Sequence, residues 1–212
     1  MKLIITILSA IFLIEIVPAA LGEEEIRHST LGTAPKTVTK EAALYNLANE
    51  LTELLESMRY VVAVNQVLIN SCSEGHYDFK GLTPDLVVTK ICNDFYPRTG
   101  IIIKQTSRMV RNPKNAPDKW EEKSLEMFDV LNYPKGTAHT EFTTRHGEEV
   151  YRFIKPIYIT KTCLRCHGPR KEISEDLREY LDTHYPNDMS TGYKEGELRG
   201  GISITIPVAG QF

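Results

Sequence analysis

Two cysteines and a histidine lie close together in the segment Cys163-Leu164-Arg165-Cys166-His167. The pattern Cys-x-x-Cys-His is the attachment signature of a c-type haem. Two thiols can form thioethers with the porphyrin vinyl groups, and the adjacent imidazole can then bind the iron. The motif therefore predicts one covalently attached haem c, held by Cys163 and Cys166, with His167 as an axial ligand of the iron.

Two other uses of a Cys-x-x-Cys pair fit the sequence less well. A redox-active pair seldom has His directly after the second Cys, and it belongs next to a thioredoxin-type strand–helix pattern. A zinc half-site would need a second pair of Cys or His at short spacing, and the sequence has none. Haem attachment is therefore the interpretation that we favour.

The N-terminal segment has the parts of a secretory signal. Lys2 precedes an apolar run over Leu3–Val17, and small residues follow at Ala20 and Gly22, so we expect cleavage after Gly22. Glu15 interrupts the apolar run. A retained N-terminal anchor is the competing interpretation, because a run of about 17 residues is the lower limit for a membrane span.

Composition and charge describe one exported globular domain. Of 212 residues, 42% are hydrophobic and 25% are charged, which is enough for one core. The net charge of -3 lacks the basic excess that nucleic-acid binding needs. We expect a signal peptide over 1–22, a flexible tether over 23–39 and a c-type haem-binding domain over 40–212. The mature protein would be periplasmic or otherwise exported, in a bacterium, without stable membrane insertion.

A long helix is predicted from near Lys40 by apolar residues that recur with a period near 3.6. The apolar positions are Leu44, Leu47, Leu51, Leu54, Met58, Val61, Leu68 and Ile69, and the residues turned outward are Glu41, Glu50, Glu53, Glu56 and Arg59. Continuing the count through Asn65 and Leu68 reaches Cys72. If the helix extends so far, Cys72 lies on its buried face.

The remaining elements predict an α+β domain. Three further helices are expected. One begins at Thr83-Pro84 and is stopped by Pro97 and Gly100, one spans Lys119–Val130 behind a capping box at Asp118, and one spans Ser174–Thr183. Strands are expected over Ile101–Ser107, Ala138–Thr144, Glu149–Thr160 and Gly201–Pro207. A four-helix cytochrome would lack these strands. We predict an antiparallel sheet with the 138–144 and 149–160 strands paired and the 201–207 strand beside them.

Several motifs together resemble a known family of secreted proteins with a single c-type haem. They are Lys80-Gly81-Leu82-Thr83-Pro84, Arg111-Asn112-Pro113-Lys114-Asn115-Ala116-Pro117-Asp118, Cys163-Leu164-Arg165-Cys166-His167-Gly168 and Arg199-Gly200-Gly201-Ile202-Ser203. The family was long catalogued as a domain of unknown function and also serves as an input domain of sensor proteins. The resemblance implies a PAS-like antiparallel sheet with a long N-terminal helix and flanking helices. It also implies His on one face of the haem and, in characterised relatives, a Cys thiolate on the other.

The resemblance makes Cys72 the second axial ligand of the iron. The family places this Cys at the end of the long N-terminal helix, and Cys72 matches that position. His76 is the alternative ligand, because many sensor-type relatives lack the helix-end Cys. Cys92 is interpreted as a buried small hydrophobic residue. A Cys72–Cys92 disulfide is a third alternative in an exported protein.

Basic side chains are candidates for binding the haem propionates. Lys104, Arg108 and Arg199 could do so, although an exposed charge is usually only solvated. Arg111 and Asn112 are better explained as partners of backbone carbonyls around the adjacent proline turns.

Iron chemistry limits what such a protein can do. A thiolate opposite His favours ferric iron, so we expect a low reduction potential compared with His/Met cytochromes. Two filled axial positions leave no room for a substrate, so we expect no enzymatic activity. The leading hypothesis is redox or gas sensing with ligand exchange at Cys72, nitric oxide or carbon monoxide being the gas ligand; the alternative is a periplasmic electron carrier. Because no transmitter domain follows Phe212, sensing would need a separate signalling or redox partner.

Overall fold

The computed structural model describes residues 38–71, 79–130, 133–134 and 136–208. The predicted signal peptide, most of the predicted tether, Cys72 and His76 lie outside the described residues. None of the helices that are described is long and apolar enough to cross a membrane. The helices are α1 (Lys40–Val64), α2 (Gln66–Asn70), α3 (Pro84–Thr99), α4 (Lys119–Val130), α5 (Leu164–His167) and α6 (Glu175–His184), and the strands are β1 (Ile102–Thr106), β2 (His139–Arg145), β3 (Glu148–Tyr158) and β4 (Leu198–Pro207).

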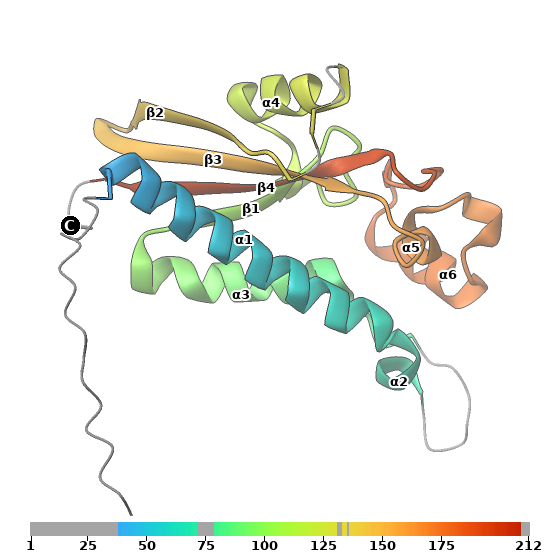
Figure 1. Ribbon diagram of the computed structural model, residues 1–212. Coiled ribbons are helices and arrows are strands. Elements are labelled where there is room, and N and C mark those ends of the chain that lie inside the picture. Colours follow the sequence, from blue (N-terminus) through green and yellow to red (C-terminus); the bar gives the residue numbers. More distant parts are fainter. Residues whose placement is uncertain (1–37, 72–78, 131–132, 135, 209–212) are drawn as a thin grey trace, which may run out of the picture. The chain divides into compact units, whose positions relative to one another are not determined.

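The four strands form one antiparallel sheet in the order β1-β4-β3-β2 (Figure 1). The predicted α+β, PAS-like fold is confirmed, and so are the pairing of β2 with β3 and the place of β4 beside them. His146 and Gly147 connect β2 to β3 with φ angles of 53° and 85°. Two successive positive φ values match the twist of a two-residue hairpin turn.

Helices α1 and α3 cover one face of the sheet, and α4 covers the other (Figure 1). Because side chains alternate along a strand, β4 presents Ile202, Ile204 and Ile206 to the first face, where all three are fully buried. On the other face, Leu125 and Phe128 of α4 pack against Ile154 of β3. The two faces of the sheet therefore belong to two separate apolar cores.

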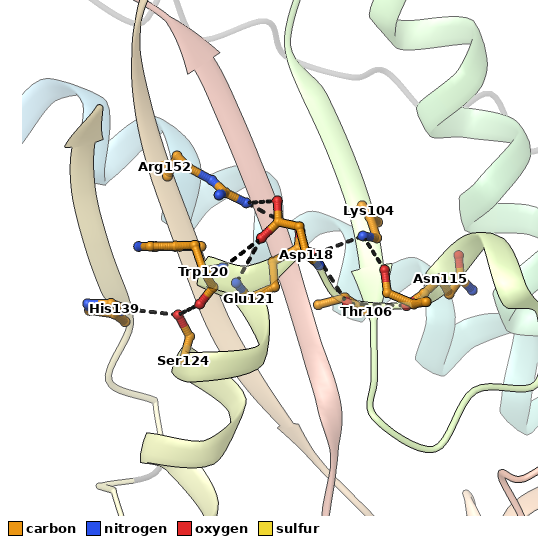
Figure 2. A network of polar contacts seen from close by, with 10 residues as sticks. Lys104, Thr106, Asn115, Asp118, Trp120, Glu121, Ser124, His139 and Arg152 are labelled. Carbon is orange, nitrogen blue, oxygen red and sulfur yellow. Dashed lines mark hydrogen bonds and ion pairs between the residues drawn. The ribbon is translucent and has the colours of Figure 1, made fainter. Parts of the chain in front are cut away.

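A polar network fastens α4 to the sheet (Figure 2). The predicted capping box forms: the Asp118 carboxylate accepts from the Glu121 N–H at 2.9 Å, and the Glu121 carboxylate accepts from the Asp118 N–H at 2.9 Å. Glu121 is buried, and its charge is balanced by Lys104 at 2.7 Å and Arg152 at 3.6 Å. The Arg152 guanidinium also lies 4.2 Å from the Trp120 ring centre. These contacts place Lys104 in a structural role.

The end of α1 differs from the prediction. Helix α1 stops at Val64, because Asn65, with φ −94° and ψ 11°, departs from the helical conformation. Its side chain donates to the Val61 carbonyl at 2.7 Å and competes there with its own N–H, which donates at 3.3 Å, and α2 begins directly afterwards at Gln66.

The predicted apolar stripe is correct for Leu44, which is buried, and for Leu47, Leu51 and Met58, which pack against the main core. It is wrong at Leu54, Val61 and Leu68, which are 57%, 56% and 73% exposed. The buried stripe consists of Leu44, Ala48, Thr52 and Leu55.

The other helices follow the prediction closely, with one correction. Helix α3 begins at Pro84 but continues past Pro97 to Thr99, where Gly100 ends it with φ 71°. Near the end of a helix, Pro97 disturbs the hydrogen bonding of the last turn only. Helix α6 agrees with its predicted range and contributes Leu177 and Leu181 to a small separate core.

Candidate functional site

A cavity of about 290 Å³ lies where the C-terminal half of α1, the start of α3, and strands β1, β3 and β4 meet the segment that carries the Cys-x-x-Cys-His motif. Cys163, Cys166 and His167 all line this cavity. The motif itself spans the short helix α5. The three residues that the sequence singled out for chemistry are thus brought to one site.

A hydrogen bond to the backbone fixes the orientation of the His167 ring. Its Nδ1 lies 2.7 Å from the carbonyl oxygen of Ser190. A carbonyl can only accept, so Nδ1 carries the hydrogen, and in the neutral ring Nε2 keeps its lone pair. Burial lowers the pKa of His167 well below its ordinary value, and the charges of Arg199 and Arg111 lower it further. His167 is therefore a neutral imidazole with Nε2 available as a metal ligand.

Residues far from the motif in sequence hold the Ser190 carbonyl in place. The Asp188 carboxylate accepts from the N–H and the hydroxyl of Ser190, both at 2.8 Å. Arg111 donates to Asp188 at 2.9 Å and to the Cys166 carbonyl at 2.7 Å. Both ion-pair partners are buried, with side chains 11% and 4% exposed. Arg111 thus has the predicted kind of partner, although the carbonyl belongs to α5 rather than to a proline turn. No local pattern in the sequence indicated Asp188 or Ser190.

The cysteines have distinct environments. Cys166 is partly buried against the α6 core, and burial raises the pKa of its thiol. The Sγ of Cys163 lies 3.2 Å from the Thr160 hydroxyl. Cys92 is buried in the main core, as the sequence predicted, and burial raises the pKa of its thiol to about 11. Among the described residues, Cys92, Cys163 and Cys166 form no disulfide with one another.

Helix α1 presents charged residues to the cavity, contrary to the prediction. Glu56 and Arg59, expected to be turned outward, line it together with Tyr60 and Ala63. Positions 56, 59, 60 and 63 lie on one helix face. Burial raises the pKa of Glu56, and the charge of Lys155 partly opposes that rise. The helical spacing of these residues is visible in the sequence, but charged residues ordinarily face solvent, so their inward orientation was not predicted.

Of the three basic candidates for propionate binding, only one lines the cavity. Arg199 lines the cavity. Lys104 pairs with Glu121 at the other face of the sheet, and Arg108 forms an ion pair with Asp129. In the part of the chain that the structure describes, one buried acceptor of the cavity has no hydrogen-bond partner, Oε1 of Gln105.

The donor set fits a covalently attached haem. Two thiols and a neutral imidazole face one cavity whose wall also carries basic side chains. Among the described residues, no three His, Cys, Asp or Glu side chains gather in a way that could hold a metal ion. A zinc site made of protein side chains therefore has no support in this part of the chain.

Comparisons with known proteins agree with the fold and with the family resemblance. The model of the Tll0287-like family matches residues 36–207. The crystal structure of the cyanobacterial haem protein Tll0287 is similar with a TM-score of 0.61 and 24% sequence identity, over 80% of this chain and 96% of that chain. At this identity the likeness shows a shared fold. No curated protein matches the chain.

Proposed function

The chain belongs to the Tll0287-like family, and from this premise we propose that it is an exported haem protein. Cys163 and Cys166 hold one haem c through thioethers, and His167 binds its iron. The observation that carries the proposal is the His167 ring, which lines the cavity with Nδ1 bound to the Ser190 carbonyl and Nε2 left as the donor. The description of the cyanobacterial relative as a haem protein supports the same cofactor.

Denaturing gel electrophoresis with haem-peroxidase staining tests the covalent attachment. Protein produced with the c-type maturation machinery should give a stained band, and Cys163→Ser/Cys166→Ser should give none, because both thioethers are lost. Extraction of intact haem by acid acetone from the wild-type protein would disprove the attachment.

Cys72 is the proposed ligand on the other side of the iron. Ferric iron stabilises a thiolate, and reduction removes one positive charge from the site, which weakens the attraction for an anionic ligand more than that for neutral His167. Cys72→Ser should abolish the thiolate signature in ferric electron paramagnetic resonance, raise the potential and open the iron to carbon monoxide. His76→Ala is the matched control and should leave the spectrum unchanged. A bis-histidine signature in the wild-type protein would refute the assignment.

The proposed role is redox or gas sensing at a low-potential haem. A labile Cys72 bond would convert reduction, or the arrival of nitric oxide or carbon monoxide, into a change of ligand. A signalling or redox protein would read this change of ligand. Carbon monoxide binding to the ferrous wild-type protein distinguishes a sensor from an electron carrier. A sensor with a labile ligand should bind the gas, whereas a carrier should keep both axial ligands through its redox cycle and should not.

A further inference from the structure

Two partly buried arginines line the cavity without an ion-pair partner in the described part of the chain. Arg59 comes from α1, and Arg199 comes from β4. The other partly buried arginine of the cavity, Arg111, is neutralised by Asp188. Arg165 is also at the cavity but is exposed, so water already solvates its charge. Arg59 and Arg199 are therefore the two cations that the site leaves unbalanced.

We propose that Arg59 and Arg199 bind the two carboxylate groups of the haem, its propionates. The inference rests on the proposed function, because it identifies which residues of the chain recognise the charged groups of that cofactor. A guanidinium has five N–H donors in a planar fork that matches a carboxylate, and it stays charged when partly buried. A haem has two carboxylate groups, and Arg59 and Arg199 provide one guanidinium for each.

Arg199 is held ready for an anion. One of its terminal nitrogens, Nη1, donates to the Ser107 hydroxyl at 2.7 Å and to the Met109 carbonyl at 3.2 Å. Its guanidinium carbon also lies 5.6 Å from the centre of the Tyr193 ring. These neutral partners fix the side chain but do not cancel its charge, and they leave the N–H groups of Nε and Nη2 for another acceptor.

Arg59 adds a second charge to the same space. Burial is the main cause that lowers the pKa of Arg59 and of Arg199, and the Arg59 charge is among the causes that lower that of Arg199 further. No acidic residue of the cavity forms an ion pair with either arginine in the described part of the chain, although the charges of Asp85 and Glu56 raise the pKa of Arg59 and that of Asp85 raises the pKa of Arg199. These effects are smaller than that of burial, and Asp85 also accepts from Gln105 at 2.9 Å. An anion bound between two like charges would relieve both their repulsion and their loss of hydration.

The test uses the haem-loaded protein and the variants Arg59→Gln and Arg199→Gln. Removal of a positive charge near the haem favours ferric iron, so each variant should have a lower midpoint potential. An unpaired propionate should also take up a proton near neutral pH, which makes the potential depend on pH. The propionate bending bands in resonance Raman spectra should shift. Arg98→Gln is the control, because Arg98 pairs with Asp94 on α3 and does not line the cavity.

The conservative variants Arg59→Lys and Arg199→Lys separate charge from geometry. Lysine keeps the charge but not the fork, so the potential should stay close to the wild-type value while the Raman bands still move; these variants also serve if a glutamine variant fails to fold. If the potential and the bands of the Arg59 and Arg199 variants equal those of Arg98→Gln, the inference is wrong even though the haem stain is present. Absence of the stain in the wild-type protein would instead refute the proposed function.

Discussion

The geometry of His167 depends on residues that do not touch its ring. Asp188 holds the Ser190 backbone, whose carbonyl accepts from Nδ1, and Arg111 holds Asp188. Partners of the second ring nitrogen of a metal-binding His fix its tautomer and raise its basicity. The hydrogen bonds that join Arg111, Asp188 and Ser190 therefore affect both the stability of the fold and the orientation of the His167 ring.

Asp188→Ala should be strongly destabilising, because it leaves Arg111 buried without a partner. Breaking a buried ion pair typically costs about 3–5 kcal/mol, so the free energy of unfolding in urea should fall by roughly 3 kcal/mol. In the haem-loaded variant the potential should rise, since an anion near the iron is lost and the imidazole becomes a weaker donor.

Asp182→Ala provides the comparison for Asp188→Ala. Asp182 pairs with Arg170, and both side chains are exposed, at 62% and 45%. An exposed pair contributes less than about 1 kcal/mol. Equal destabilisation by the two variants would contradict the role given to Asp188.

The reactive residues were readable from the sequence because their signature is local. Cys163, Cys166 and His167 are neighbours, and their spacing alone indicates haem attachment. Ser190 and Asp188 lie more than twenty residues along the chain and act through a backbone carbonyl. Such a contact depends on tertiary structure and has no sequence pattern.

The starts of the helices were predicted well because the signals for them, caps and apolar periodicity, are local. Thr39 and Thr83 each accept from a backbone N–H three residues ahead, at 3.2 Å, and Asp118 forms its capping box. The face that α1 turns to the cavity was not predicted. Periodicity distinguishes apolar from polar positions, but a cofactor cavity recruits charged residues such as Glu56 and Arg59 to an inward face.

The approach of β1 to β4 at the edge of the cavity requires glycine at position 200. A Cβ there would lie 2.1 Å from the Thr106 carbonyl oxygen, and φ is +155°. Gly200→Ala should therefore lower the free energy of unfolding by about 3 kcal/mol, combining backbone strain with a steric clash. Gly192→Ala is the control: its φ is +86°, but a Cβ there meets nothing within 4 Å. It should cost only about 1 kcal/mol. Similar urea midpoints for the two variants would contradict this explanation.

The attachment of α4 should weaken in mild acid through His139. Its Nδ1 lies 2.8 Å from the Ser124 hydroxyl, which itself donates to the Trp120 carbonyl, so Nδ1 donates. Burial lowers the pKa of His139, while the charge of Glu141 raises it and that of Lys123 lowers it. His139 therefore binds a proton more readily in the unfolded state than in the folded state. The stability that neutral His139 contributes above a pH of about 6.5, its ordinary pKa, is lost as the pH falls below that value.

His139→Asn tests this linkage, because asparagine can donate at the Nδ1 position but does not titrate. The difference in unfolding free energy between the wild-type protein and the variant should shrink as the pH is lowered from neutral to mildly acidic. A difference that stays constant across this range would show that His139 does not cause the acid sensitivity.

The molecule as a whole consists of a sheet with its own cores and a peripheral segment around the cavity. The main core and the α4 core contain the large buried apolar side chains of the sheet, such as Phe153, Ile154 and Ile204. The α5–α6 segment has a core of three buried residues, Ile173, Leu177 and Leu181. In Figure 1 this segment lies at one end of the sheet, next to the C-terminal half of α1. Its few apolar contacts make it the part most dependent on the bound group.

Loss of the haem should consequently loosen one side of the molecule and leave the sheet intact. In Cys163→Ser/Cys166→Ser, the like charges of Arg59 and Arg199 share the cavity without the proposed anions, and α5–α6 keeps only its small core. Hydrogen exchange followed by mass spectrometry should be faster in residues 56–70 and 163–193 than in the haem-loaded protein. Strands β3 and β4, whose amides are paired in the centre of the sheet, should keep their protection. Uniform loss of protection would mean that the haem supports the entire fold, and unchanged protection at the cavity would mean that these segments pack without it.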